Sequence, residues 1–273
     1  MIPLPPTLSD LQMEFGCVPL HLDAITSSGV LWEVADGQFL LRVPNVARYF
    51  VERGERITIQ PDPEAQMMEV KRFAAMTPLA AAAYQRGRLV LNAATVVNGS
   101  GDAVAFTGIG VSGKSTLAMS LLLHGWRLLS DDLAVISWSD AGGPIAEAAD
   151  SGLWLWPDAA AGLSLPSAKD SGRTFHQVEN PKIAGPSRLK AIVRLGLEDG
   201  DRVSLEAELG AKAVMSAGYA IYNRRIALAI MTPVRIFELL AEIVRTTSSL
   251  HLRRPLRGWS VDDVTRRFLE WDS

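Results

Sequence analysis

One glycine-rich segment constrains the fold of this chain more than any other feature. It consists of Gly108, Ile109, Gly110, Val111, Ser112, Gly113, Lys114 and Ser115. The segment satisfies the pattern G-x-x-x-x-G-K-[ST], follows the apolar run 103–107 and opens a helix-favouring stretch that stops at Gly125. In that setting the glycines let backbone N–H groups and the helix N-terminus face an anion, which predicts a phosphate-binding loop (P-loop). The alternative, a glycine-rich turn that binds nothing, is disfavoured by the lysine, the serine and the flanking elements.

The side chains that end the motif have separate expected roles in binding a nucleotide. Lys114 is expected to neutralise the β- and γ-phosphates, and the hydroxyl of Ser115 is expected to bind Mg²⁺. Thr116 continues the first helical turn and is expected to line the site. The sequence lacks the segments typical of transporter ATPases and the base-reading N-K-x-D motif of GTPases. The second metal-binding element therefore has to indicate the class of nucleotide-binding protein.

That acidic element is the pair Asp131-Asp132, which begins 17 residues after Lys114. The spacing allows one helix and one short strand, so the pair is predicted at the end of, or at a kink in, the next strand. Two adjacent carboxylates suit phosphoryl transfer because one can hold Mg²⁺ while the other accepts the proton of the attacking hydroxyl. The spacing does not divide these roles; we assign Asp131 as the base and Asp132 as the metal-side ligand. The alternative is a surface turn.

Composition narrows the possible partners and compartment. The net charge of the 273 residues is −3, which lacks the basic excess of a nucleic-acid-binding chain. No apolar stretch reaches the roughly 18–20 residues that span a bilayer, and Cys17 is the single cysteine, so no internal disulfide can form. We therefore expect a cytoplasmic protein with no nucleic-acid or membrane partner.

Patterning along the chain predicts an α/β protein in three parts. Residues 1–64 form a small β-rich subdomain with a hairpin around Asp36-Gly37, residues 65–87 form a connecting helix interrupted near Pro78, and residues 88–273 form the P-loop domain. Ser260 is expected to cap a last helix in capping-box fashion. The basic loop 165–187 is either a lid that closes over the phosphates or a solvated loop. Within it, Arg173 is the residue that we expect to contact a phosphate.

Residues 108–136, GIGVSGKSTLAMSLLLHGWRLLSDDLAVI, resemble the catalytic segment of the HPr kinase/phosphorylase family, in which a P-loop is followed closely by a helix, an Arg-Leu pair and two aspartates. Residues 84–108 resemble the strand pair that precedes the P-loop in HPr-kinase-related bacterial proteins. A weaker resemblance continues through 153–163 to 187–195. The N-terminal part resembles that of the shorter HPr-kinase-related proteins.

The resemblance implies ATP-dependent, Mg²⁺-assisted phosphorylation of a serine hydroxyl on a protein, on a fold shared with phosphoenolpyruvate carboxykinase. Some shorter relatives are similar to kinases of ribosomally made peptides, including lasso-peptide precursors, and the family implies a possible homo-oligomer. The chain departs from the family at Asn92, where a histidine is common; asparagine can hydrogen-bond but cannot carry a proton or positive charge. Asn92 therefore keeps open a nucleotide-bound peptide-recognition module without phosphotransfer. A small-molecule kinase on the same scaffold is a further alternative.

Overall fold

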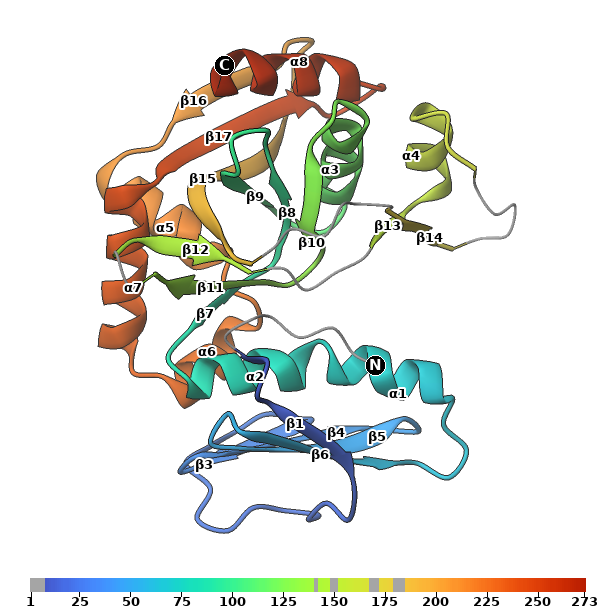
Figure 1. The fold of residues 1–273 in the computed structure, drawn as a ribbon, viewed down its shortest axis with the longest axis vertical. Coiled ribbons are helices and arrows are strands. Elements are labelled where there is room, and N and C mark those ends of the chain that lie inside the picture. The colour runs from blue at the N-terminus through green and yellow to red at the C-terminus, as the bar shows by residue number, and fades with distance from the viewer. Residues whose placement is uncertain (1–7, 140–141, 148–151, 167–171, 179–184) are drawn as a thin grey trace. The chain divides into compact units, whose positions relative to one another are not determined.

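A computed structural model describes residues 8–139, 142–147, 152–166, 172–178 and 185–273 of the chain (Figure 1). The chain divides into two compact units, which are described separately. Unit 1 comprises Met1–Val90 and Ile221–Leu239, and unit 2 comprises Leu91–Ala220 and Leu240–Ser273. Both units combine helices with a sheet, which confirms a mixed α/β protein. The predicted division into a β-rich subdomain (1–64), a connecting helix (65–87) and a P-loop domain (88–273) stays a prediction.

Unit 1 is built on a six-stranded sheet with the order β1-β6-β5-β4-β3-β2. The strands are β1 (Gln12–Phe15), β2 (Ser27–Ser28), β3 (Trp32–Ala35), β4 (Gln38–Val43), β5 (Ala47–Glu52) and β6 (Arg56–Pro61). The predicted hairpin is confirmed, because β3 and β4 pair antiparallel across Asp36-Gly37 and Gly37 has φ +65°. The sequence favours a buried, inert thiol for the single Cys17, as is usual for a free cysteine, and this prediction is wrong, because Cys17 is exposed.

The helices of unit 1 are α1 (Met67–Ala74), α2 (Thr77–Gln85) and α6 (Arg224–Ile230). The predicted interrupted helix is thus two helices, and Pro78 lies in the first turn of α2, where its missing N–H leaves no bond unmade. The hydroxyl of Tyr49 donates to the carbonyl oxygen of Val70 at 2.9 Å and fixes α1 to the sheet. Two elements, β7 (Leu89–Leu91) and α7 (Pro233–Thr246), contain residues of both units.

Unit 2 contains the glycine-rich motif and a larger, mixed sheet. Within this unit the strand order is β10-β8-β9-β15-β12-β11, with β17 paired to β15 and β16 paired to β17. The strands are β8 (Ala93–Val97), β9 (Ala103–Thr107), β10 (Arg127–Ser130), β11 (Ala134–Trp138), β12 (Pro144–Ala146), β15 (Ser187–Glu198), β16 (Ser204–Ala207) and β17 (Ser248–Pro255). A separate pair is formed by β13 (Gly152–Leu155) and β14 (Thr174–Gln177).

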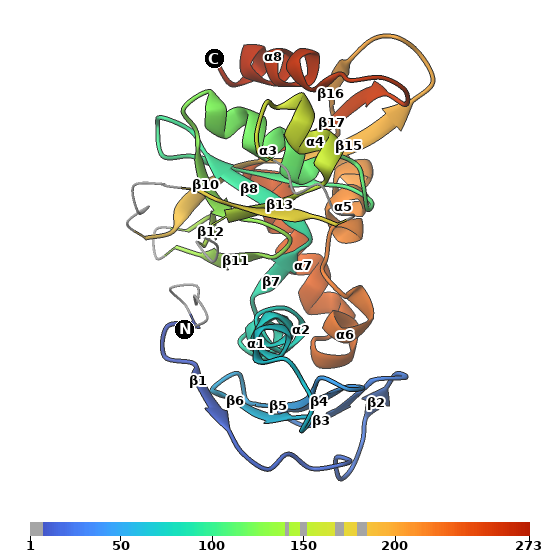
Figure 2. The same ribbon diagram turned by 90° about the vertical axis from the view of Figure 1, so that its right-hand side faces the viewer.

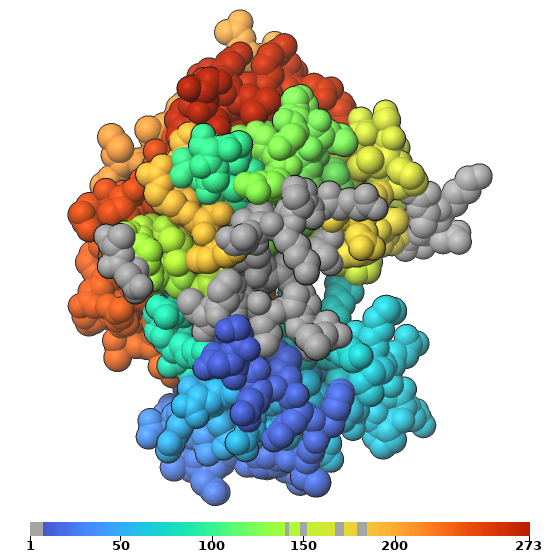
Figure 3. Space-filling view, in the orientation of Figure 1, coloured from blue at the N-terminus to red at the C-terminus, as the bar shows by residue number. Residues whose placement is uncertain are grey.

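Four helices lie wholly in unit 2: α3 (Lys114–Leu123), α4 (Pro157–Gly162), α5 (Gly210–Tyr219) and α8 (Val261–Asp272). Helices α3 and α8 contact each other and share a core in which the rings of Phe106 and Phe268 pack edge to face, 5.0 Å apart. Figures 1 and 2 show α3 and α8 close together, and Figure 3 shows α8 (red) beside α3 (green) at the surface of this unit. The aromatic core therefore fixes the helix that begins at the motif.

Strand directions bring the functional segments to one edge of this sheet. Strand β8 is antiparallel to both β9 and β10, so β9 and β10 run in the same direction. Strand β15 is parallel to β9, and β17 is parallel to β15. The carboxyl ends of β10, β9, β15 and β17 therefore lie at the same edge, the usual position of ligand sites in parallel sheets. The acidic pair and the glycine-rich motif both begin there.

None of the helices in the described part of the chain has the length and apolarity needed to span a membrane.

Candidate functional site

The glycine-rich loop leaves β9 after Thr107 and enters α3 at Lys114 through backbone conformations that few residues adopt. Gly108 has φ +149° and Gly113 has φ +99°. A Cβ atom on Gly108 would lie 2.7 Å from the Ser112 Oγ and 2.9 Å from the carbonyl oxygen of Leu195 in β15. Val111 has φ +58°, an uncommon value for a β-branched residue. The loop is therefore held in a strained shape, as is common at ligand sites.

This close approach predicts the effect of Gly108→Ala. The new methyl group collides with β15 and the loop must open, so we expect affinity for Mg-ATP to fall at least tenfold and the protein to lose about 1–3 kcal/mol of stability. Calorimetric titration and urea unfolding measure the two effects. Gly99→Ala is the matched control, because a Cβ there meets nothing within 4 Å. Unchanged affinity in Gly108→Ala would contradict the tight loop.

Lys114 lies on the buried face of α3. It shares that face with Leu117, Ala118 and Leu121, at spacings of three, four and seven residues. The residue is only 9% exposed, and its Nζ donates to the carbonyl oxygen of Gly108 at 3.2 Å. Burial lowers the pKa of this ammonium, and the nearby Asp132 and Asp131 partly oppose that shift. A desolvated cation at a glycine-rich loop is suited to an anionic ligand.

Asp131 lies directly after β10 and is bonded to the first turn of α3. The Ser115 Oγ donates to its Oδ1 at 2.9 Å, and the backbone N–H of Trp154 donates to its Oδ2 at 3.3 Å. Burial, with the second carboxylate of Asp132, raises the pKa of Asp131 to about 6, although the two hydrogen bonds oppose the shift. The predicted metal-binding hydroxyl and one predicted acidic residue are thus in direct contact.

Asp132 follows with φ +67° and lines the cavity described below. Its Oδ2 lies 3.9 Å from the Nη1 of Arg173, and the Arg173 guanidinium lies 5.3 Å from the centre of the Trp156 ring. An arginine over a tryptophan ring is stabilised by a cation–π interaction. Of the basic loop, Arg173 thus lies beside the acidic pair, whereas Lys169 and Lys182 lie outside the described residues.

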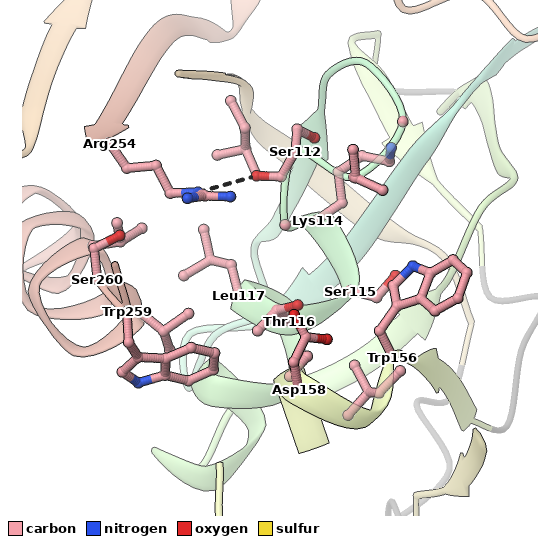
Figure 4. Close-up of a pocket in the computed structure, with 18 of the residues that line it drawn as sticks. Ser112, Lys114, Ser115, Thr116, Leu117, Trp156, Asp158, Arg254, Trp259 and Ser260 are labelled. Carbon is pink, nitrogen blue, oxygen red and sulfur yellow. Dashed lines mark hydrogen bonds between the residues drawn. The ribbon is translucent and has the colours of Figure 1, made fainter. Parts of the chain in front are cut away.

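The loop, Asp132 and residues of α3, α4 and α8 line a cavity of about 550 Å³ (Figure 4). The residues of the predicted site that line it are Asn92, Gly110, Val111, Ser112, Gly113, Lys114, Ser115, Thr116, Asp132 and Arg173. Asn92 follows β7, and its backbone N–H donates to the Ala220 carbonyl at 2.7 Å. The Ile109 side chain is 75% exposed.

Further lining residues are Asp158 of α4, Arg254 of β17, and Trp259 and Ser260 before α8. The sequence indicated no role in the nucleotide site for any of them. Arg254 donates from Nε to the Ser112 carbonyl at 3.4 Å, and burial lowers the pKa of its guanidinium. It pairs in register with Leu197, near the carboxyl end of β15. The available signal was a basic run at the end of a strand, which is informative only once that strand is known to be parallel to its neighbour.

The residues of this arrangement suit a nucleotide with Mg²⁺. Within the described residues, no group of three or more His, Cys, Asp or Glu side chains could hold a metal. A cation here would therefore share its ligands between Ser115, an aspartate, water and phosphate oxygens, as Mg²⁺ does in phosphoryl-transfer sites. Ser112 lines the cavity and its buried Oγ has no partner in the structure, so a phosphate oxygen could accept from it. The residues fit the group.

Comparison with known proteins shows a distant likeness among solved structures. Neither a family model nor a curated protein sequence matches the chain. Among solved structures the chain is similar to the Hpr(Ser) kinase/phosphatase from Coxiella burnetii, with 13% sequence identity over 67% of this chain and 99% of that chain, and a TM-score of 0.35. A likeness this distant does not identify a substrate.

Proposed function

We propose that the protein is an ATP-dependent kinase that phosphorylates a serine hydroxyl of a small protein or ribosomally made peptide. The observation that carries the proposal is the 2.9 Å hydrogen bond between Ser115 of the glycine-rich motif and Asp131 of the acidic pair, beside the buried Lys114. These groups come from separate segments, and Lys114, Ser115 and Asp132 line one cavity. Together they supply a phosphate cradle, a cation and two carboxylates, which are the parts that phosphoryl transfer requires.

The chain's own residues would bind and align the reactants. Backbone N–H groups of the loop and the Lys114 ammonium would hold the β- and γ-phosphates, and Arg173 lines the same cavity beside Asp132. When bound, Mg²⁺ neutralises charge that develops on the phosphate oxygens. One carboxylate accepts the proton of the serine hydroxyl, and a pKa of about 6 for Asp131 is close to the value that suits a general base near neutral pH.

Two observations bear on the roles of the aspartates. The raised pKa of Asp131 favours the assignment of Asp131 as base and Asp132 as metal-side ligand. The hydrogen bond from Ser115 favours the reverse, because it sets Asp131 beside the hydroxyl expected to bind Mg²⁺, while Asp132 faces the cavity. We propose that the hydrogen bond between Ser115 and Asp131 is the stronger indication, so that Asp131 acts on the metal side and Asp132 accepts the proton.

Magnesium titration of Asp131→Asn and Asp132→Asn tests this division. The variant that lacks the metal-side carboxylate should need several-fold more Mg²⁺ for half-maximal rate and recover part of its rate in excess Mg²⁺. The variant that lacks the base should lose about 10²–10⁴-fold in kcat at every Mg²⁺ concentration. We expect the first behaviour from Asp131→Asn and the second from Asp132→Asn. The opposite pattern would restore the assignment made from the sequence.

The acceptor is proposed from sequence resemblance rather than from the cavity. The segment 84–136 resembles HPr-kinase-related proteins, and some of the shorter ones are similar to kinases of lasso-peptide precursors; a homo-oligomer is proposed on the same ground. Asn92 lines the cavity where the family commonly has histidine. That observation favours a second candidate, a nucleotide-bound peptide-recognition module without phosphotransfer.

Mass spectrometry distinguishes the two candidates. The protein is incubated with Mg-ATP and, in parallel, a serine-bearing precursor peptide from a neighbouring gene and an HPr protein. A gain of phosphate on either acceptor that disappears in Lys114→Met supports the kinase. Nucleotide binding with no phosphate gain on either acceptor would favour the recognition module, and phosphate gain only on small alcohols would indicate a small-molecule kinase.

A further inference from the structure

The cavity extends well past the phosphate-binding loop into an apolar region between α3, α4 and α8. In Figure 4, Thr116 and Leu117 lie between Lys114 at one end and Trp259 at the other. The apolar lining of the cavity includes Leu117 of α3, Leu252 of β17, and Val261 and Val264 of α8, all buried. Triphosphate groups gain nothing from such a lining, so the far end is suited to another part of a ligand.

Trp259 forms an aromatic wall of this far end. Its ring atoms lie so close to Gly162 of α4 that a Cβ atom there would be 2.5 Å from the Cη2 and Cζ2 atoms of the indole. The tryptophan is nevertheless 46% exposed and lines the cavity. The indole is thus supported by α4 on one side and leaves the rest of its surface available, which is the arrangement of a stacking platform.

A buried polar atom beside this wall lacks a partner. Ser260 is 8% exposed and lines the cavity, and its Oγ forms no hydrogen bond in the structure. Ser260 is the N-cap residue of α8, as the sequence predicted, but the predicted capping-box bond is absent, because its side chain makes no cap hydrogen bond. A buried hydroxyl without a partner is costly unless a ligand supplies one. Ser260 therefore points to a ligand with a polar edge.

Two charged residues border the space between the wall and the loop. Arg254 contacts the Ser112 carbonyl and stands between the phosphate end and Ser260 (Figure 4). Asp158 lies four residues before Gly162 on α4, hence on the same helical face as the residue that supports Trp259. A carboxylate at this place accepts hydrogen bonds from neighbouring hydroxyl groups, such as those of a ribose.

From these contacts we propose that the far end is a nucleoside subsite, in which Trp259 stacks on a purine base, Ser260 hydrogen-bonds to the edge of that base and Asp158 accepts from the ribose hydroxyls. This inference rests on the proposed function, since it requires the phosphates to lie at the glycine-rich loop. It identifies the phosphate donor as a purine nucleoside triphosphate, in contrast to a donor recognised only by its phosphates.

Binding measurements on the full chain separate the subsite from the phosphate site. Titration calorimetry with Mg-ATP, Mg-CTP and Mg-tripolyphosphate compares the wild-type protein with Trp259→Ala, Trp259→Phe and Lys114→Met. We expect Trp259→Ala to weaken ATP binding about tenfold to a hundredfold, the range for loss of one base–aromatic stack, and to leave tripolyphosphate binding unchanged. Trp259→Phe should retain most of the ATP affinity, and Lys114→Met should weaken both ligands.

Gly162→Ala provides an independent test that leaves Trp259 in place. Gly162 has no positive φ, so alanine suits the helix there, but its methyl group displaces the indole. We expect weaker ATP binding, unchanged tripolyphosphate binding and unchanged thermal stability.

Equal affinity for ATP in wild type, Trp259→Ala and Gly162→Ala, with a loss in Lys114→Met, would overturn the subsite and leave the proposed function standing. Equal affinity of the wild type for ATP and CTP would overturn the purine assignment. If the wild type binds none of the three ligands, both the subsite and the proposed function are wrong.

Discussion

Lys114→Met is expected to lower the rate of phosphoryl transfer by about a hundredfold to a thousandfold, the usual cost of removing one preorganised group that stabilises transition-state charge. The expectation follows from where the ammonium lies. It is buried on the inner face of α3, bonded to the Gly108 carbonyl, and borders the cavity beside Asp132. Methionine keeps the length and apolar stem of lysine but removes the charge that would hold the β- and γ-phosphates.

The measurement is the initial rate of phosphate transfer from ATP to the acceptor found by mass spectrometry, with thermal unfolding as a check on the fold. Burial disfavours the Lys114 ammonium and lowers its pKa, so methionine should leave the melting temperature unchanged or higher. Lys71→Met is the matched control, because Lys71 is an exposed lysine of α1 in unit 1. Transfer at the wild-type rate by a folded Lys114→Met protein would show that the glycine-rich motif does not carry the chemistry.

The part of the site that could be predicted from the sequence is the part formed by adjacent residues. Strand, loop and helix around 103–124 follow from an apolar run, glycines and a helical pattern, and the structure has them as β9, the loop and α3. The acidic pair was expected at the end of, or at a kink in, the next strand. It lies in the break between β10 and β11, where Asp132 adopts a positive φ that ends the strand.

The opposite wall could not be predicted because it depends on long-range pairing. The sequence shows only a basic run at 253–257, which could hold an acidic peptide or form an exposed strand. In the structure, residues 248–255 are β17 and pair with β15. That pairing brings Arg254 to the Ser112 carbonyl across 142 positions of sequence. Likewise, the contact between Trp259 and Gly162 joins a turn before α8 to the end of α4, a short helix that the local pattern did not indicate. Local propensity carries no information on either contact.

Asp131→Asn is expected to change how stability depends on pH, in addition to its effect on transfer. The pKa of this carboxyl is about 6 in the folded protein, against an ordinary value of 3.8. The folded state therefore binds the proton more tightly than the unfolded state, and stability falls as pH rises between these two values. A shift of about two pH units corresponds to ~3 kcal/mol at 1.36 kcal/mol per unit. Asparagine carries no charge at any pH and avoids this loss.

Urea unfolding of both proteins from about pH 4 to pH 7, without Mg²⁺ or nucleotide, measures the effect. The stability of Asp131→Asn relative to wild type should rise by ~3 kcal/mol across that range. Asparagine has one carbonyl oxygen for the two donors, Ser115 and Trp154, which adds a cost that is the same at every pH. Ser115→Ala should act in the opposite direction. The hydrogen bond from Ser115 lowers the pKa of Asp131, so its removal raises that pKa further and extends the pH-dependent loss of stability to higher pH. Parallel curves for wild type and Asp131→Asn would contradict a raised pKa and remove one argument for Asp131 as a general base.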